Sequence, residues 1–524
     1  MRKLKDITAS KAWIKVDDLD FANCRINDLL SINDGEAEVI VIVSKISDND
    51  IDSQMDDNVI MEELKQPSLK VFECSILGSV VDGEFQQQTD RYPCTDARIK
   101  KIADHEIYSM LYPDVRKNIW NGFCIGDYVG HSTNAWIDGN KFYQRHSCIV
   151  GNTGCGKSET VTKILEETSS LPSAKMIVFD IHGEYGNLSY ADHIKIGEVP
   201  FPIWMLGFSD MAANVLKVKE DSTVVMSALR KAYHSQVGKY ANENKPVYFS
   251  YGKMSQDIEL LDNEQIPSGV YASGDKKGLP KFVNGDYYGK LTKIGNTMQQ
   301  LLCDKRYAFL FEDMEMADSY IDYFVNRIMG GDKPVKNIDL SGIPHEIAVL
   351  VIGAIAKLIY NIQMMQKDRE PMTLVCDEAH VYIPADFQLT ASQRRMVEIF
   401  ENIAKEGRKF GITLLIASQR PSELNKTIMA QCANYMVMKL NNENDKSMMK
   451  GMMPSGSADV IETTAMFSPG DCLVVGDACP IPLKIHVELA KERPQSKTID
   501  FWTEWGKERD SVDYAACLEE YLEN

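Results

Sequence analysis

The chain has 524 residues, which is too long for a single hydrophobic core, so we expect two to four domains. Hydrophobic residues make up 44% and charged residues 25%, which are the proportions of an ordinary soluble globular protein and exclude a largely disordered chain. The formal net charge of −19 opposes non-specific adhesion to nucleic acid over the whole surface, but it still permits a local basic channel.

No segment of the sequence predicts secretion or a membrane span. Residues 1–13 lack the apolar stretch of a signal peptide, and the longest apolar run, residues 347–356, is too short to cross a bilayer. The twelve cysteines are scattered without a CxxC pair, which argues against zinc sites and a disulfide framework. We therefore expect a cytoplasmic protein without a membrane partner.

The first 130 residues predict a β-rich domain. Residues 39–43 and 71–81 are apolar and rich in β-branched side chains, and Asp, Asn and Gly clusters flank them. We expect a small barrel or sandwich here, and assign residues 1–130 to an N-terminal β-barrel.

Residues 131–490 predict an α/β core with a parallel sheet, because short apolar strands alternate with helical segments from about residue 146 onward. Such strands are buried on both faces and therefore lack polar alternation. The predicted strands are residues 147–150, 176–179, 337–340, 373–376, 412–417 and 435–439.

A long insertion at about residues 209–311 interrupts the core and is predicted to be helical. Its second part is the most basic stretch of the chain. The basic residues there are Lys276, Lys277, Lys281, Lys290, Lys293, Lys305 and Arg306. They form either a solvated surface or a contact with DNA.

The core is followed by a predicted β-hairpin, residues 472–475 and 483–487, around a turn at 476–480. The C-terminal tail, residues 491–524, is amphipathic and acidic. We expect this tail to contact a neighbouring subunit or an effector protein.

Residues 151–158 match the phosphate-binding motif G-x-x-x-x-G-K-[ST] at every fixed position, between a predicted strand and a predicted helix. Its glycines let backbone N–H groups converge on an anion, and the helix N-terminus adds partial positive charge. We expect Lys157 to bind the β- and γ-phosphates and Ser158 to ligate Mg²⁺. The predicted ATP-binding residues are Gly151, Asn152, Thr153, Gly154, Cys155, Gly156, Lys157, Ser158 and Glu159.

Two acids, Asp377 and Glu378, end a predicted strand and complete the expected site. Asp377 would hold Mg²⁺ through water, and Glu378 would act as general base toward the attacking water. The string Asp-Glu-Ala-His at 377–380 also spells the box of DEAH helicases. Those proteins need a second recombinase-like domain with a Q-x-x-G-R-x-x-R motif, which this sequence lacks, so we interpret the match as superficial.

Several ordered strings over about residues 120–490 resemble the HerA group of the HerA/FtsK ATPases. They are RH at 145–146, VFDIHGEY at 178–185, IDLS at 338–341, VCDEAH at 375–380, EGRKFG at 406–411 and ASQRP at 417–421. The resemblance implies a RecA-like core, an N-terminal β-barrel and a homo-hexamer that pumps double-stranded DNA through a central channel. It also implies an effector, such as a nuclease, docked on the barrel.

The same resemblance implies roles for four further residues. Arg408 is similar to the arginine finger that reaches the γ-phosphate from a neighbouring subunit, an effect worth about 10³–10⁵ in rate. Arg145 is a second candidate for that role. Gln419 is similar to the sensor of the γ-phosphate, and Asp180 would assist the metal or the water.

Two functions fit these features. The first is a ring motor that hydrolyses ATP to translocate on duplex DNA and feed a partner nuclease. The second is an ATP-controlled scaffold that assembles and regulates a toxic effector, a nuclease or a sirtuin-like NAD-consuming enzyme, in bacterial anti-phage defence. The acidic composition favours an effector-coupled defence ATPase slightly, and Glu378 argues against a protein that binds nucleotide without turnover.

Overall fold

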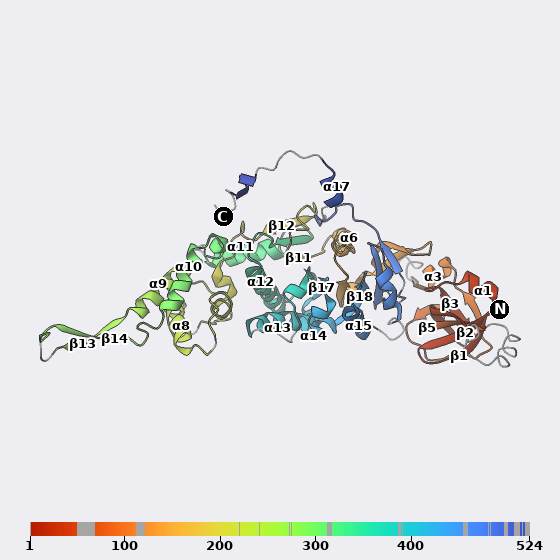
Figure 1. Cartoon of the computed structure of the whole chain (residues 1–524), viewed down its shortest axis with the longest axis horizontal. Helices are drawn as coiled ribbons and strands as arrows, with labels where there is room; N and C mark the ends of the chain where they lie inside the picture. Colours follow the sequence, from red (N-terminus) through yellow and green to blue (C-terminus); the bar gives the residue numbers. More distant parts are fainter. Residues whose placement is uncertain are drawn as a thin grey trace. The chain divides into compact units, whose positions relative to one another are not determined.

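The chain folds into two compact units (Figure 1). Unit 1 comprises Met1–Leu171, Glu378–His380 and Thr413–Arg493, and unit 2 comprises Pro172–Asp377, Val381–Ile412 and Pro494–Asn524. The computed structural model describes residues 2–49, 69–111, 121–219, 221–239, 241–271, 273, 275–311, 317–385, 389, 391–453, 459–479, 481–482, 484–496, 501–507, 514–515 and 517–518.

The N-terminal part of unit 1 is an antiparallel sheet with the strand order β1-β2-β5-β4-β3-β7, and β6 pairs with β5. Alternate residues of β4, Val39, Val41 and Val43, are buried in one core with Phe72 of β5. The strands are β1 (Lys3–Ile7), β2 (Lys11–Val16), β3 (Leu29–Asn33), β4 (Glu38–Asn49), β5 (Leu69–Val81), β6 (Glu84–Gln86) and β7 (Arg98–Lys101), accompanied by helices α1 (Asp18–Asn23) and α3 (Asp104–Leu111). This part is β-rich as predicted, whereas closure into a barrel and a boundary at residue 130 stay predictions.

The rest of unit 1 is built on a second sheet. Strands β17, β10 and β18 are parallel neighbours, and the sheet continues antiparallel through β19, β20, β8 and β9. The strands are β8 (Gly122–Tyr128), β9 (Asn134–Asp138), β10 (His146–Val150), β17 (Ile412–Ser418), β18 (Cys432–Val437), β19 (Asp471–Gly476) and β20 (Lys484–Val487). The helices are α5 (Gly139–Tyr143), α6 (Lys157–Ser169), α14 (Lys426–Met429) and α15 (Glu443–Met452), with 3-10 turns η7 (Pro421–Glu423) and η8 (Asp459–Met466). The pairing of β19 with β20 confirms the predicted hairpin, although Pro480 and Leu483 lie outside the described residues.

Unit 2 contains a parallel sheet with the order β12-β15-β11-β16. The strands are β11 (Met176–Asp180), β12 (Ala191–Lys195), β15 (Val335–Asp339) and β16 (Met372–Cys376). The helices are α11 (Ala317–Met329), α12 (His345–Met365), α13 (Ala391–Glu406) and α17 (Phe501–Trp505), with 3-10 turns η4 (Ala379–Val381) and η6 (Gly407–Phe410). The two units together have the mixed α/β composition that the sequence predicts.

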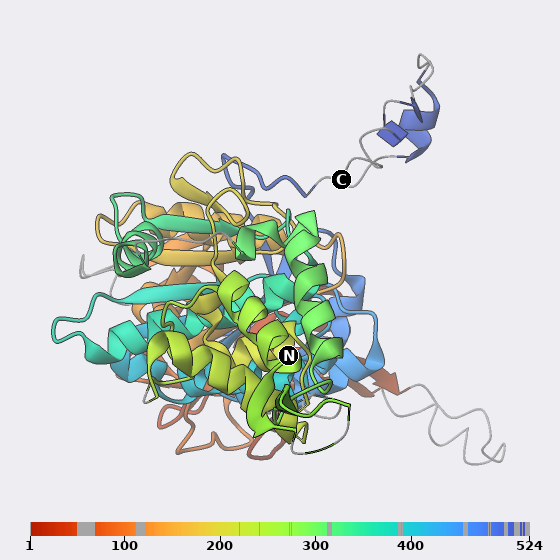
Figure 2. The same ribbon diagram turned by 90° about the vertical axis from the view of Figure 1, so that its left-hand side faces the viewer.

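Helices α8 (Thr223–Val237), α9 (Tyr251–Asp262) and α10 (Thr292–Cys303) occupy the predicted insertion, and α9 packs beside both α8 and α10 (Figures 1 and 2). Before them lie η1 (Ile203–Leu206), α7 (Phe208–Asp210) and the π-helical turn η2 (Met211–Val215), and η3 (Lys305–Leu310) follows them. Between α9 and α10 a hairpin of β13 (Gln265–Val270) and β14 (Pro280–Asn284) appears that the sequence did not predict. The insertion boundaries at 209 and 311 stay a prediction.

Helix α12 is the one described helix that is long and apolar enough to cross a membrane, judged by length and composition. The apolar run at residues 347–356 lies inside this 21-residue helix, so the apolar segment is longer than the run alone indicates. Half of the apolar stretch of α12 is buried within the protein, including Ile352, Ile355 and Ile359. The core helix of a soluble protein passes the same test, so α12 is weak support for a membrane span.

Candidate functional site

The phosphate loop joins β10 to α6 within unit 1, as the motif predicts. Gly154 and Gly156 have φ angles of 75° and 102°, in the region that favours glycine. A Cβ atom at Gly151 would lie 2.6 Å from Cys155 Sγ and 2.8 Å from Met438 Cβ, closer than real Cβ contacts. These three glycines therefore allow a backbone path that is closed to other residues.

Hydrogen bonds attach this loop to neighbouring segments of unit 1. The Asn152 N–H donates to the Lys439 carbonyl at 2.9 Å, and the Gly470 N–H donates to the Cys155 carbonyl, also at 2.9 Å. The Lys157 ammonium donates to the Asn152 carbonyl at 3.3 Å, so the lysine folds back over its own loop. The cation thus lies where a phosphate bound by the loop would meet it.

A chain of polar contacts joins the predicted general base to the phosphate loop. The Gln419 amide donates to Glu378 Oε1, and the Thr153 hydroxyl donates to Gln419 Oε1. All three residues belong to unit 1. One amide side chain therefore connects the tip of the loop to the carboxylate, and the role of Gln419 as a sensor of the γ-phosphate stays a prediction.

Glu378 itself is 7% exposed, and its Oε2 atom makes no hydrogen bond within the described part of the chain. The His380 imidazole Nδ1 lies 3.3 Å from this oxygen, and the Ser418 hydroxyl lies 3.3 Å from the same nitrogen. Burial lowers the pKa of His380, against the opposing effect of Glu378, so the imidazole is neutral at neutral pH. A buried carboxylate oxygen without a donor is suited to accept a proton from water.

His380 is a neighbour of the site that the sequence analysis did not select. The signal for it in the sequence is the fourth position of the Asp-Glu-Ala-His string at 377–380. The contact with Glu378 accounts for this histidine by its local surroundings. The contact does not support an assignment to DEAH helicases.

Asp377 ends β16 in unit 2 and directly precedes Glu378. It is 3% exposed, and its backbone carbonyl accepts a hydrogen bond from the Tyr382 hydroxyl at 3.0 Å. The structure therefore places the predicted magnesium ligand at a buried strand end, and its role stays a prediction.

Asp180 ends β11 of unit 2 and is fully buried. Its carboxylate accepts hydrogen bonds from the backbone N–H groups of Glu184 at 2.9 Å and Tyr185 at 3.0 Å, and from the Asn337 amide at 3.2 Å. Burial raises the pKa of Asp180 in spite of these donors. With three donors bound, Asp180 orders the turn that follows β11, and a role toward the metal or the water stays a prediction.

The two arginine candidates lie in different surroundings. Arg408 is exposed in the 3-10 turn η6 of unit 2. Arg145 of unit 1 has its Nε atom 3.6 Å from Asp477 Oδ2, and both side chains are about half exposed. An exposed ion pair of this kind contributes only about 0–1 kcal/mol, so Asp477 does not hold Arg145 away from a second chain.

Ser158 and Glu159 open helix α6. Ser158 is half-buried and its carbonyl accepts a hydrogen bond from the Thr162 hydroxyl at 2.8 Å. The Glu159 Oε2 atom is buried without a hydrogen bond in the described part of the chain, and burial raises the pKa of Glu159 against the opposing effect of Arg493. The loop and its following turn thus present both a hydroxyl and an unsatisfied carboxyl group.

The donor types fit magnesium. A serine hydroxyl and an aspartate carboxylate are the hard oxygen ligands that Mg²⁺ prefers, usually together with water and substrate phosphates. Among the described residues there is no group of three or more His, Cys, Asp or Glu side chains that could hold a metal ion. A magnesium ion held by Ser158 would therefore need phosphate oxygens and water among its other ligands, and Asp377 as a further ligand stays a prediction.

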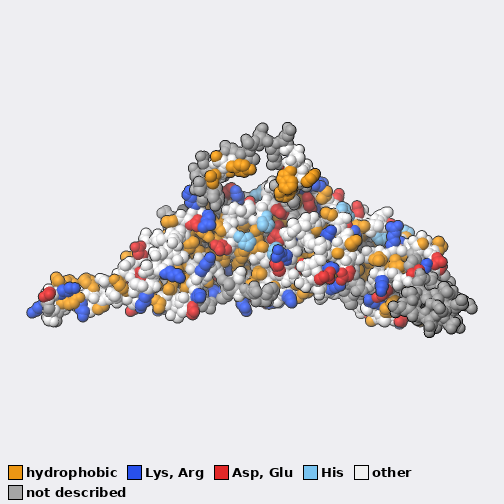
Figure 3. Space-filling model, in the orientation of Figure 1, with side chains coloured by type: hydrophobic (Ala, Val, Ile, Leu, Met, Phe, Trp, Pro, Cys, Tyr) orange, Lys and Arg blue, Asp and Glu red, His pale blue; other side chains and the backbone are white. Residues whose placement is uncertain are grey.

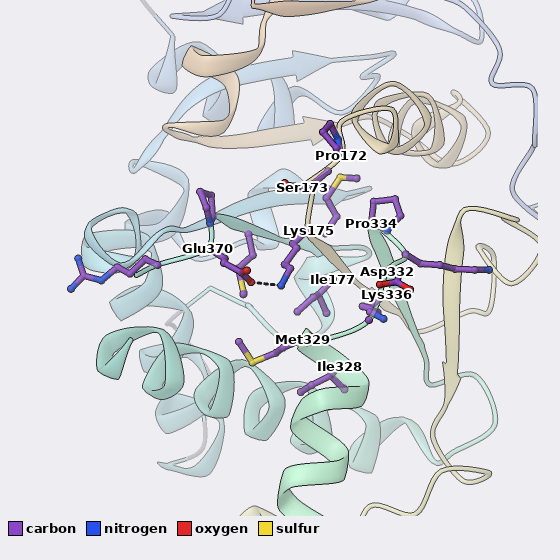
Figure 4. A pocket seen from close by; sticks show the side chains of 18 residues that line it. Pro172, Ser173, Lys175, Ile177, Ile328, Met329, Asp332, Pro334, Lys336 and Glu370 are labelled. Carbon is purple, nitrogen blue, oxygen red and sulfur yellow. Dashed lines mark hydrogen bonds and ion pairs between the residues drawn. The ribbon is translucent and has the colours of Figure 1, made fainter. Parts of the chain in front are cut away.

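A cavity of about 550 Å³ lies in unit 2, where β11, β15 and β16 begin (Figure 4). The Lys175 ammonium and the Glu370 carboxylate form an ion pair in its lining. Parallel α/β sheets bind nucleotides at the opposite, carboxyl ends of their strands. None of the predicted site residues lines this cavity, so it is not the candidate ATP site.

Comparison with known proteins is consistent with this geometry. The family model for the central domain of the helicase HerA matches residues 123–359. The DNA double-strand break repair helicase HerA of Saccharolobus solfataricus is 23% identical over 89% of this chain and 87% of its own length. The protein of the same name from Sulfurisphaera tokodaii is 23% identical over 88% of each chain. Among solved structures, VirB4 of Thermoanaerobacter pseudethanolicus is 12% identical, with a TM-score of 0.49 over 71% of this chain and 97% of that one.

Both relatives are matched along nearly their whole length, and the matched central domain contains the phosphate loop at residues 151–158. The loop lies between a buried strand and a helix, as in other P-loop ATPases. The chain is therefore similar to the HerA group of P-loop ATPases, through its central domain and over most of its length.

Proposed function

We propose that this chain forms a homo-hexameric ring that hydrolyses ATP to move double-stranded DNA through its channel and to drive a bound effector in bacterial anti-phage defence. The effector would be a nuclease or an NAD-consuming enzyme docked on the N-terminal domain. The observation that carries the proposal is the contact chain from Thr153 through Gln419 to Glu378, because it couples the phosphate loop to a buried base. The printed names of the relatives, DNA repair helicases, support DNA as the substrate.

Each residue of the proposed site has a distinct task. The loop N–H groups and Lys157 bind the phosphates, and Glu378 accepts the proton of the attacking water. Gln419 positions that water and reports the loss of the γ-phosphate to Thr153. Magnesium, bound by Ser158 and through water by Asp377, would neutralise phosphate charge. Arg408 of a neighbouring subunit would stabilise the charge that develops on the γ-phosphate, with Arg145 as the second candidate.

The composition favours a second function, an ATP-controlled switch that assembles and regulates its effector without processive translocation. A net charge of −19 repels the phosphate backbone over most of the surface, which a scaffold tolerates better than a DNA motor.

Steady-state ATP turnover and displacement of a DNA triplex distinguish the two functions. For the motor we expect linear duplex DNA to raise turnover at least about tenfold, which is about 1.4 kcal/mol in barrier height, and the third strand to be displaced. Glu378→Gln serves as the control without hydrolysis. Equal turnover with and without DNA, together with an intact triplex, would contradict the motor and favour the switch.

A further inference from the structure

The hairpin β13–β14 has no partner within the described part of the chain. Every residue of both strands is exposed, and the two strands pair only with each other. Phe282 is 50% exposed and Val270 is 63% exposed. A two-stranded hairpin is marginally stable in water by itself, so an ordered hairpin with exposed apolar side chains calls for a surface to pack on.

The strand register divides these apolar side chains between two faces. Pro267 pairs with Phe282, and Val270 pairs with Pro280. Because Pro280 and Phe282 are two residues apart on β14, they and their partners share one face, and we call these four residues the Phe282 face. The opposite face contains the pair Ile266 and Val283, and Lys281 interrupts it. The Phe282 face is therefore the more continuous apolar surface.

The edges of the hairpin are poor sites for adding another strand. Pro267 lies in β13 and Pro280 lies in β14, and proline has no N–H group to donate to a neighbouring strand. Packing on a face is therefore favoured over extension of the sheet.

The charge of the hairpin indicates what covers that face. Residues 265–284 contain Lys276, Lys277 and Lys281 against one acid, Asp275, in a chain whose net charge is −19. In Figure 3 basic and apolar side chains lie together over β13 and β14, at the left. The chain as a whole is acidic, with 76 Asp and Glu against 57 Lys and Arg, so a second copy of it complements the charge of the hairpin.

We propose that the Phe282 face docks on a second copy of this chain, with the nearby lysines adding attraction to its acidic surface. DNA fits the face less well, because phosphates bind cations and offer nothing to four apolar side chains. The inference deepens the proposed function, since it names a contact that would hold the ring together.

Two substitutions on the Phe282 face test the contact. In Phe282→Ser with Val270→Ser, we expect the protein concentration needed for assembly to rise at least about tenfold, or about 1.4 kcal/mol. Light scattering and mass photometry of the full chain with ATP measure this concentration. The matched control, Ile266→Ser with Val283→Ser, removes two apolar side chains from the opposite face and should assemble like the wild type. All four side chains are exposed, so circular dichroism should show every variant folded.

A photoreactive benzoylphenylalanine at position 282 identifies the occupant directly. On irradiation of the assembled wild-type background we expect a covalent dimer of this chain, with the second attachment site located by mass spectrometry. The proposal is overturned if the Phe282-face variant assembles like the wild type, or if it loses affinity for DNA while assembly is unchanged. ATP turnover of the wild type is measured separately. Assembly that depends on the Phe282 face in a chain without turnover would support the contact and contradict the proposed function.

Discussion

The backbone at Glu378 has a φ angle of 45°, in the left-handed region that residues other than glycine rarely adopt. Such a conformation costs about 1–2 kcal/mol for a residue with a Cβ atom. Strain of this kind persists where the surrounding structure holds it, and here it keeps the carboxylate next to Gln419 and His380.

The strained backbone at Glu378 should lower the free energy of unfolding unless glycine occupies this position. Both Glu378→Ala and Glu378→Gly should abolish turnover, because both remove the carboxylate. We expect Glu378→Gly to be the more stable of the two by about 1 kcal/mol, since glycine relieves the left-handed backbone. Chemical denaturation of the two variants measures the difference, and an alanine variant at least as stable as the glycine variant would contradict the strain.

For single residues, the sequence predicts which side chains take part in the chemistry better than it predicts which side chains contact one another. The phosphate loop and the acids Asp377 and Glu378 follow from local spacing, which a motif captures. The bond between Thr153 and Gln419 joins residues 266 positions apart, and no local pattern encodes it. The sequence likewise does not predict His380 as a site residue, because only the fold shows that its ring lies beside Glu378.

Asp471, the first residue of β19, links that strand to β20 through its side chain. Its Oδ1 atom lies 2.9 Å from His486 Nδ1, and its Oδ2 atom lies 2.6 Å from Lys484 Nζ. The preceding residue, Gly470, donates its N–H to the Cys155 carbonyl of the loop. Burial acts to raise the pKa of Asp471, but Lys484 and His486 lower it below the ordinary value of 3.8.

Replacing Asp471 with Asn should therefore cost about 1–2 kcal/mol in the free energy of unfolding at neutral pH. Because the folded-state pKa is lowered, this contribution is complete above the ordinary pKa of 3.8 and is lost as pH falls through the folded-state value. Chemical denaturation of the wild type and Asp471→Asn, at several pH values from neutral to about pH 3, measures the difference between their free energies of unfolding. The matched control is Asp477→Asn, which changes an exposed carboxylate. If this difference in free energy does not become smaller in acid, the stabilising role of the ionised Asp471 carboxylate is contradicted.

The turn η6, which contains Arg408, is held by Arg369 within unit 2. The Arg369 guanidinium donates to the Lys409 carbonyl at 2.8 Å and lies over the Phe410 ring, 5.1 Å from its centroid. The Tyr360 ring meets Phe410 edge to face. We therefore expect Arg369 to act as a positioning residue for Arg408, the arginine that is proposed to act across the ring.

We expect Arg369→Ala to lower ATP turnover about tenfold without changing ATP affinity, because Arg408 loses its support. The control is Lys367→Ala, which changes an exposed cation in the same segment between α12 and β16 and should have no effect. If Arg369 acts through Arg408, the double variant should be no slower than Arg408→Ala alone. Additive losses would show instead that Arg369 acts elsewhere.

At the element scale the sequence predicts strands that are buried on both faces. Strands β10, β11, β16 and β17 appear within a residue of their predicted bounds, because each is buried along its whole length and lacks polar alternation. Strand β18 spans Cys432–Val437, not 435–439 as predicted, because its first half contains Asn434, a polar residue that is buried and hydrogen-bonded. Strand β12, with the sequence ADHIK, was missed because it has no apolar run.

For the whole molecule, the likeness to HerA follows from several short strings in a fixed order, and the comparisons with known proteins find the same likeness. The exposed β13–β14 hairpin could not be predicted in the same way. Its apolar residues are what a buried strand would show, and only the structure reveals that nothing in the described chain covers them. The hexamer, the effector and the DNA channel stay predictions, since they depend on chains other than this one.

The central claim is that Lys157 and Glu378 serve one ATP site. Equilibrium binding of Mg-ATP combined with single-turnover hydrolysis, on the wild type and two variants, measures it most directly. We predict that Lys157→Ala loses ATP binding, whereas Glu378→Gln binds ATP like the wild type and hydrolyses it about 10²–10⁴-fold more slowly. A wild-type protein that does not bind Mg-ATP, or a Glu378→Gln variant that hydrolyses it at the wild-type rate, would contradict the claim.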